Sequence, residues 1–158
     1  MIAYDRAMCP EIMNLQGDVF YIASKKMPGL DEAWFISGYM RTRVRSLLDI
    51  GNFAYAYMSY SAILEIVLAE MNGSDTAHGD FTPVEYKRGN AVCDAMWIGM
   101  MYSYYQWRSG IASKELVERL ALETMERIYP ALHQMGWESA AHKIHSNVLM
   151  IGELEELQ

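Results

Sequence analysis

The positions of the turn-forming residues constrain this sequence more than any other feature. Its breaks fall at Pro28-Gly29, Gly51-Asn52, residues 72–80, Gly110, Pro130 and Gly136. The intervals between them have helical length, and none shows the short polar–apolar alternation that is typical of strands. The chain therefore predicts an all-α fold, a compact bundle of six or seven helices. Because no repeat or long linker occurs, we expect one helical domain over residues 1–158, in which 1–17 can be irregular and 152–158 form an acidic end.

The clearest helical pattern is a row of apolar and aromatic residues between the second and third breaks. Its members recur at intervals of four, three, four, three and four: Phe53, Tyr57, Tyr60, Leu64, Val67 and Met71. That spacing places them on one face of a helix of about five turns, which we expect to face the core. Asn72-Gly73 should end this helix. Asp31 should be the N-cap of the preceding helix, which lies between the first and second breaks.

The second half of the sequence predicts a central helix. Thr82-Pro83-Val84-Glu85 has the form of a capping box, so a helix is expected over about 83–108. Its second half reads MWIGMMYSYYQW, which is apolar or aromatic on every side and is typical of a helix surrounded by others. Ser113 should cap the next helix, which Pro130 should break or kink, and a last helix should run from about Trp137 to Met150.

Charge and cysteine content exclude several classes of function. With 13 basic and 20 acidic residues the net charge is −7, which argues against binding to nucleic acid or to anionic membranes. Cys9 and Cys93 cannot form a disulfide framework, so a reducing compartment is favoured. Asp5 and Arg6 stand where a secretory peptide would carry its apolar core, and no stretch reaches the ~20 apolar residues of a spanning helix. We therefore expect a cytoplasmic protein.

No pattern predicts a catalytic site or a cofactor. The sequence contains no nucleophile elbow, phosphate loop or His-Glu-x-x-His motif. His133, His142 and His145 could in principle bind zinc together with Cys9 or Cys93, but we favour their interpretation as surface histidines. The prediction is that no residue is catalytic and that no metal or cofactor is bound.

Two arginines form a candidate docking site. Arg41 and Arg45 are four residues apart and should share a helical face, whereas Arg43 points away. They could bind a small anion or an acidic partner, or they could be solvated and paired with local acids such as Asp49, the interpretation that we favour.

Methionine and tyrosine are unusually frequent, with 13 and 11 residues. Many lie on the two helices that we expect to pack centrally, so some must be buried with their hydroxyl groups hydrogen-bonded. The same residue types are also enriched at protein interfaces, and a homodimer is compatible with this composition. The candidate interaction or pocket residues are Tyr102, Tyr104, Trp107, Arg108, Tyr129 and His133.

Two blocks of the sequence read MWIGMMYSYYQWRSGIASKELVERL and ETMERIYPALHQMGWESAAHKI. They resemble a family of small helical bacterial proteins in which a Trp-(Ile)-Gly-Tyr-x-Tyr-Arg-Tyr-Trp core precedes a Thr-Gly-x-Ser-Ser-Lys turn. Upstream, SGYMRTRVRSLLD is similar to that family's Tyr-Met-Asn-Ser…Leu-Asp helix. The resemblance covers residues from about Asp18 to Ile144 and preserves order and spacing loosely.

The positions that match this family are Tyr39, Met40, Asp49, Trp97, Gly99, Tyr102, Tyr104, Trp107, Gly110, Ser113, Lys114, Met125, Tyr129 and His133. Met100 replaces the family's first tyrosine after glycine, and Ser103 replaces its arginine, so the role of that guanidinium is lost or transferred to Arg108. Genes of the family tend to lie near a predicted ADP-ribosyltransferase-like protein. The resemblance therefore implies an antitoxin or accessory role, which a fold alone does not establish.

Three functions follow from these observations. The first is a non-enzymatic interaction module, the antitoxin or regulatory component of a toxin–antitoxin-like or mobile-element system, which binds a neighbouring toxin-like protein. The second is a small-molecule site or enzyme inside the bundle, lined by Tyr102, Trp107, Tyr129 and His133, with Arg108 as its charged group. The third is a DNA-binding autoregulator that uses the helix of Arg41 and Arg45, which the net charge disfavours.

Overall fold

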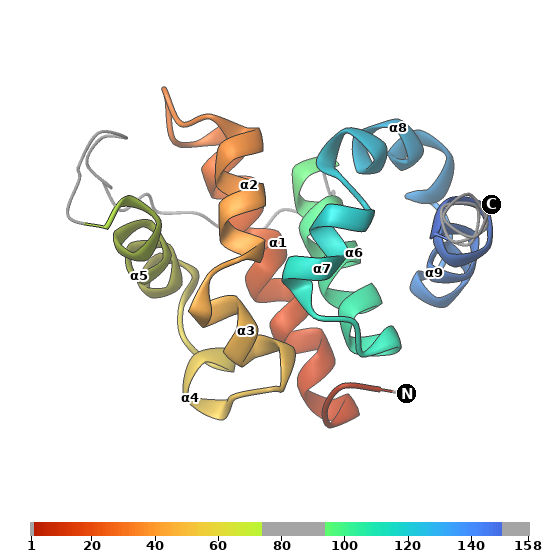
Figure 1. Ribbon diagram of the computed structural model, residues 1–158, viewed down its shortest axis with the longest axis horizontal. Helices are drawn as coiled ribbons and strands as arrows, with labels where there is room; N and C mark the ends of the chain where they lie inside the picture. The colour runs from red at the N-terminus through yellow and green to blue at the C-terminus, as the bar shows by residue number, and fades with distance from the viewer. Residues whose placement is uncertain (1, 74–93, 150–158) are drawn as a thin grey trace.

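The computed structural model describes residues 2–73 and 94–149, which form α-helices and no β-strand (Figure 1). The predicted all-α bundle is confirmed. Within these ranges nine α-helices occur: α1 Cys9–Lys25, α2 Glu32–Met40, α3 Arg43–Asp49, α4 Phe53–Ala56, α5 Tyr60–Asn72, α6 Asp94–Ser109, α7 Ser113–Arg119, α8 Leu122–Leu132 and α9 Trp137–Ile144. A short 3-10 helix, Arg6–Met8, precedes α1, and a π-helical turn, His145–Leu149, follows α9. Across 2–73 and 94–149, no helix is both long and apolar enough to span a membrane.

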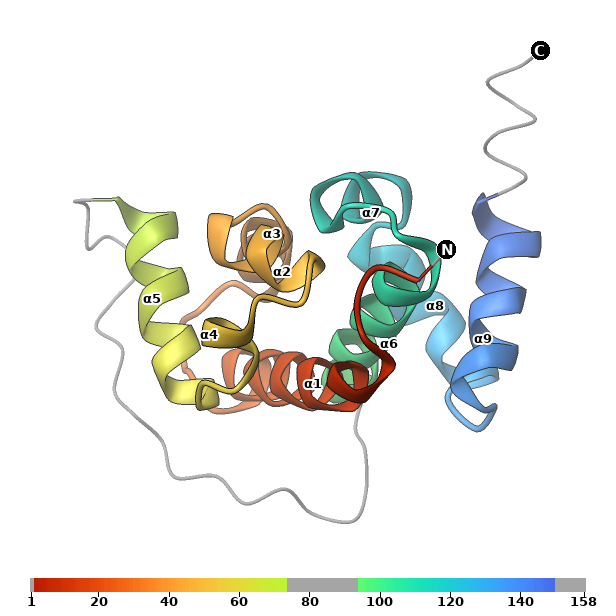
Figure 2. The same cartoon turned by 90° about the horizontal axis from the view of Figure 1, so that it is seen from below.

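Helices α1 and α6 form the centre of the molecule, with α5 and α9 at its opposite ends (Figures 1 and 2). Gly99 lets α1 and α6 approach closely, because a Cβ at this position would lie 2.8 Å from the carbonyl oxygen of Gln16. The Gln16 side chain crosses the same contact and donates from Nε2 to the Gly99 carbonyl oxygen at 2.7 Å. All but four of the sixteen residues of α6 are buried, which confirms it as the central helix. The expected capping box at 82–85 lies outside the described residues.

The N-terminal segment is more regular than the sequence indicated. We expected 1–17 to be able to remain irregular, but α1 begins at Cys9. Pro10 suits the first turn of a helix, where no intrahelical N–H donor is needed. Ile12, Met13 and Leu15 are then buried in the core, so the pattern of apolar residues continues upstream of Asp18.

The predicted five-turn helix is divided, and its first turn does not face the core. Ser59 caps α5 by accepting the N–H of Ala62 at 3.2 Å, so the helix starts again after a non-helical break. Because of this new start, the residues before Ser59 do not continue the buried face of α5. Phe53 and Tyr57, expected to be buried, are 73% and 52% exposed, whereas Leu64 is fully buried. Thr42 divides the predicted 31–49 helix in the same way, accepting the N–H of Arg45. These divisions raise the helix number above the expected six or seven.

In the second half, one predicted helix cap is wrong and the expected break at Pro130 does not occur. Ser113 is the first residue of α7 and not its cap, because its hydroxyl group donates to a carboxylate from another helix. Pro130 neither breaks nor ends α8, which continues to Leu132. Because it lies in the last turn, the lost N–H donor affects a single intrahelical bond. The chain breaks instead at Leu120, between α7 and α8.

A buried polar cluster joins α3, α6 and α7. The carboxylate of Asp49 accepts the backbone N–H of Ser113 at 2.9 Å and its hydroxyl group at 2.5 Å, and so serves as the cap that α7 lacks locally. Arg45 is fully buried, with Nη2 3.5 Å from Asp49 Oδ1 and 3.4 Å from the Oε1 atom of Gln106. Its Nε and Nη1 atoms have no hydrogen-bond partner within the described residues. Asp49 is therefore the only carboxylate in the described chain that is shown to pair with this buried cation.

We predict that Asp49→Ala lowers the free energy of unfolding by about 3–5 kcal/mol, because it leaves Arg45 as a buried, unpaired cation. As the control, Glu118→Ala removes the exposed Arg41–Glu118 ion pair and should cost at most about 1 kcal/mol. Urea unfolding followed by circular dichroism measures both. Changing Arg45 to Met in the Asp49→Ala background should recover part of the loss. A double variant less stable than Asp49→Ala would contradict the pairing.

We also predict that Phe53→Ser changes the free energy of unfolding by no more than about 0.5 kcal/mol, since the ring is mostly in solvent. Leu64 belongs to the same predicted row and is buried in the core, so Leu64→Ala should lower the free energy of unfolding by about 2–5 kcal/mol. Denaturant titration of the two variants distinguishes the observed arrangement from the sequence pattern. Equal losses would mean that Phe53 is packed in solution.

Candidate binding site

Three of the candidate residues lie together on the last turns of α6. Tyr104, Trp107 and Arg108 face the beginning of α9 and the segment that leads into α1. Trp107 is held in place by its Nε1 atom, which donates to the Tyr4 carbonyl oxygen at 2.9 Å, and the N–H of Ala3 donates to the Trp107 carbonyl oxygen. The N-terminal segment thereby fixes this end of α6.

A hollow lies between the start of α1, α6 and the first residue of α9, with a volume of about 360 Å³. We call it the aromatic hollow. Its walls are Arg6, Cys9, Pro10, Met13, Asn14, Met100, Tyr104, Trp107 and Trp137. The Tyr104 ring lies 5.6 Å from that of Trp107 and 6.4 Å from that of Trp137, and the Arg6 guanidinium lies 5.9 Å from the centre of the Trp107 ring. Burial raises the pKa of the Cys9 thiol to about 11, so this cysteine is not an activated nucleophile.

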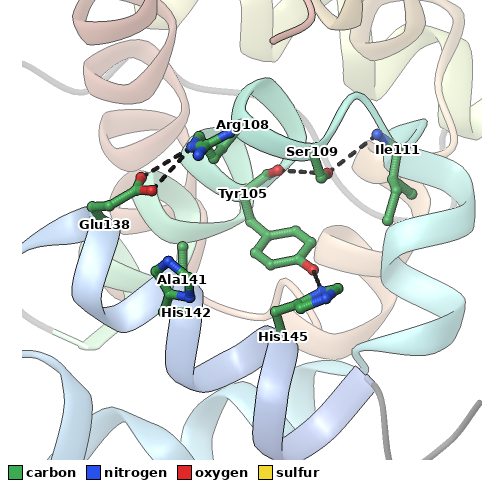
Figure 3. A pocket seen from close by; sticks show the side chains of 8 residues that line it. All are labelled: Tyr105, Arg108, Ser109, Ile111, Glu138, Ala141, His142 and His145. Carbon is green, nitrogen blue, oxygen red and sulfur yellow. Dashed lines mark hydrogen bonds and ion pairs between the residues drawn. The ribbon is translucent and has the colours of Figure 1, made fainter. Parts of the chain in front are cut away.

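A second hollow, of about 390 Å³, lies between the end of α6 and the face of α9 that is turned toward it (Figure 3). We call it the polar hollow. It is lined by Tyr105, Arg108, Ser109, Ile111, Glu138, Ala141, His142 and His145. Figure 3 shows the Tyr105 ring extending across it, with the Arg108–Glu138 pair on one side and His145 on the other.

The side chain of Glu138 lines the polar hollow and contacts Tyr104 of the aromatic hollow. The Tyr104 hydroxyl group donates to Glu138 Oε2 at 2.5 Å, and Arg108 Nε lies 3.1 and 3.2 Å from the two carboxylate oxygens. The hydrogen bond from Tyr104 and the pair with Arg108 hold the pKa of Glu138 below its ordinary value. The pKa of Tyr104 is raised to about 12, first by burial and then by the adjacent carboxylate. The three side chains thus link the aromatic hollow to the polar one.

The remaining candidate residues lie elsewhere. Tyr102 is a core residue whose hydroxyl group donates to the Leu120 carbonyl oxygen at 2.6 Å. The rings of Tyr129 of α8 and of His133, the C-cap residue of α8, stack at 4.5 Å, and the Tyr129 ring lies against Trp97. Neither lines the aromatic or the polar hollow. The pocket predicted from Tyr102, Trp107, Tyr129, His133 and Arg108 is therefore not formed by these residues together.

The predicted face of Arg41 and Arg45 does not exist. Arg41 ends α2, is exposed and pairs with Glu118 of α7 at 2.6 Å. Arg45 belongs to α3 and is fully buried beside Asp49. Because Thr42 starts a new helix between them, the four-residue spacing does not place the two side chains on one helical face.

Sequence reasoning missed several residues of this region. Arg6 lay in the segment expected to be able to remain irregular, and no periodic signal connected it to Trp107. Trp137 could have been found, because it follows Gly136 at the predicted start of the last helix. His142 and His145 are exposed, as expected of surface histidines, but they also line the polar hollow. The chain also has an unpredicted exposed apolar patch at Ile50, Phe53 and Tyr57.

In the part of the chain that the structure describes, no three His, Cys, Asp or Glu side chains are placed to hold a metal ion together. Comparisons of the sequence with protein-family models, curated proteins and solved structures give no match.

We predict that Tyr104→Phe raises the pKa of Glu138 toward its ordinary value, because the mutation removes the first cause of its depression. The folded-state pKa lies below the unfolded one, so the contact stabilises the fold at neutral pH and is lost as the pH falls through the folded value. Carboxyl carbon chemical shifts followed through a pH titration measure the change. Tyr57→Phe alters an exposed ring with no contact to Glu138 and is the control. An unchanged Glu138 titration in Tyr104→Phe would contradict the hydrogen bond.

Proposed function

We propose that this chain is a non-enzymatic interaction protein that binds an acidic segment of a partner protein at the aromatic hollow. The partner segment would place one large apolar side chain in the hollow, against Tyr104, Trp107 and Trp137. It would place a carboxylate near Arg6. The role implied by the resemblance to the helical bacterial family is that of the antitoxin or regulatory component of a toxin–antitoxin-like or mobile-element system, with a toxin-like protein as the partner.

The observation that carries this proposal is the clustering of interface-forming residue types around one hollow. Tryptophan, tyrosine, methionine and arginine are the types enriched at protein interfaces, and Trp, Tyr and Arg dominate their energetic centres. All four types line the aromatic hollow. Tyr104 and Trp137 are only partly buried by the chain itself, so a partner would remove further apolar surface from water.

Charge complementarity supports an acidic partner. The whole chain carries a net charge of −7, yet the exposed Arg6 lines the aromatic hollow. Arg108 of the neighbouring polar hollow is also exposed, but it is paired with Glu138. Among the residues that the structure describes, Glu138 is the one acidic residue that lines either hollow. An acidic segment is therefore attracted here, whereas it is repelled by the acidic surface elsewhere.

The other two functions fit the described arrangement less well. The predicted small-molecule pocket needed five side chains that do not converge. The DNA-binding function needed Arg41 and Arg45 on one face, but one is paired with Glu118 and the other is buried. A basic helical face is what such a function requires.

We predict that Arg6→Glu weakens the complex with the partner at least about tenfold, because it reverses a charge beside the Trp107 ring. Arg127→Glu, an equal charge change at an exposed position on α8 that lines neither hollow, should leave the affinity unchanged. The test is co-expression with the proteins encoded by the neighbouring genes, followed by size exclusion with light scattering and titration calorimetry of the isolated complex.

Two results would contradict the proposal. One is a complex that both arginine variants form equally well, which would place the partner elsewhere, for example on the Ile50–Phe53–Tyr57 patch. The other is a chain that forms no complex with any neighbour. Light scattering of the chain alone also shows whether it is a monomer or a homodimer, since its mass is 18.1 kDa.

A further inference from the structure

We propose that the polar hollow is a binding site for a small organic carboxylate with a short apolar tail. This inference does not depend on the partner protein, because it concerns residues of α6 and α9 on the other side of Glu138. The hollow of about 390 Å³ falls in the range of small-molecule sites, and it combines one apolar side with a few polar groups.

Arg108 is the anchor for the carboxylate. Its Nε atom is bound to both oxygens of Glu138, which fixes the plane of the guanidinium. Within the described residues neither Nη1 nor Nη2 makes a hydrogen bond, and 46% of the side chain is exposed. The two Nη groups form the end of the guanidinium that binds a carboxylate through two parallel hydrogen bonds.

His145 supplies a second donor. The Tyr105 hydroxyl group lies 3.1 Å from His145 Nδ1. We assign the hydroxyl group as the donor, because a phenol is more acidic than a neutral imidazole N–H. Nδ1 is then the acceptor, and the proton of the neutral ring is on Nε2, which leaves Nε2–H as a donor. The same bond orients the ring, as a second partner does for ligand-binding histidines.

The charges of the hollow favour a monoanion over a dianion. Arg108 contributes one positive charge and Glu138 one negative charge, and these two charges offset each other. The second charge of a phosphate dianion would be attracted by Arg108 and repelled by Glu138, so it would gain little here while its desolvation would cost more than that of a carboxylate. Ile111, Ala141 and the face of the Tyr105 ring provide the apolar side against which a short hydrocarbon tail can pack.

The experiment titrates the full-length chain with benzoate and hexanoate, followed by amide chemical shifts in NMR spectra. We expect a Kd of about 1 mM, ordinary for ligands of this size, with shifts confined to the ends of α6 and α9. Arg108→Gln should weaken binding at least about tenfold. Glu138→Gln retains an acceptor for Tyr104 and Arg108 but removes the repelling charge, so it should tighten binding several-fold.

The controls separate the possible outcomes. Benzamide and hexanamide have the same shape without the charge, and equal binding of amides and acids would overturn the proposal. Binding of inorganic phosphate but not of the carboxylates would overturn it as well. Arg108→Lys keeps the charge without the planar pair of donors and should bind with intermediate affinity, which keeps the test informative if Arg108→Gln does not fold. Arg6→Glu should bind carboxylates like the wild-type chain even if it loses the partner protein.

Discussion

The burial of Arg45 is the constraint on which the arrangement of the helices depends. A guanidinium without solvent exposure is tolerated only where other groups compensate its charge, and Asp49 and Gln106 provide the contacts for this. Asp49 also holds the first residue of α7 by two hydrogen bonds, and Gln106 donates to the Asp49 carbonyl oxygen at 3.1 Å. One ion pair therefore fixes α3, α6 and α7 relative to one another. Such a pair adds specificity more reliably than stability, because its desolvation cost offsets most of the attraction.

The candidate site follows from that fixed position of α6. Gln106 faces inward to the polar cluster, and the neighbouring Tyr104, Trp107 and Arg108 project from other sides of the same turns. The N-terminal segment crosses α6 through its bonds with Trp107, which positions Arg6 at the edge of the aromatic hollow. Helix α9 completes both hollows, and its exposed Glu138 binds Tyr104 and Arg108 of α6. The site is thus assembled from three segments that are far apart in the sequence.

Local signals in the sequence predicted what local physics determines. The all-α class, the Asp31 cap and the central position of the MWIGMMYSYYQW helix depend on propensity, capping and apolar content, and each is confirmed. The exposure of Phe53 could not be predicted from its spacing, because periodicity assumes one continuous helix and Ser59 starts a new one. The burial of Arg45 was equally hidden, since Gln106 is 61 residues away. Tyr104, Trp107 and Arg108 were found together because they are close in sequence, whereas Arg6 and Trp137 join them only through tertiary packing.

Glu138 connects the two hollows, so ligands bound there as proposed would be energetically dependent on each other. Its carboxylate is shared between the Tyr104 hydroxyl group, which borders the aromatic hollow, and Arg108, which borders the polar one. A carboxylate bound to the Nη groups of Arg108 competes with Glu138 for the same positive charge and leaves Glu138 more dependent on Tyr104. A partner side chain that moves the Tyr104 ring would weaken the Tyr104–Glu138 hydrogen bond. Glu138 would then depend more on its ion pair with Arg108. By linkage, each ligand then changes the affinity for the other by the same factor. The coupling passes through one exposed ion pair, so it is modest and weakens as salt screens that pair.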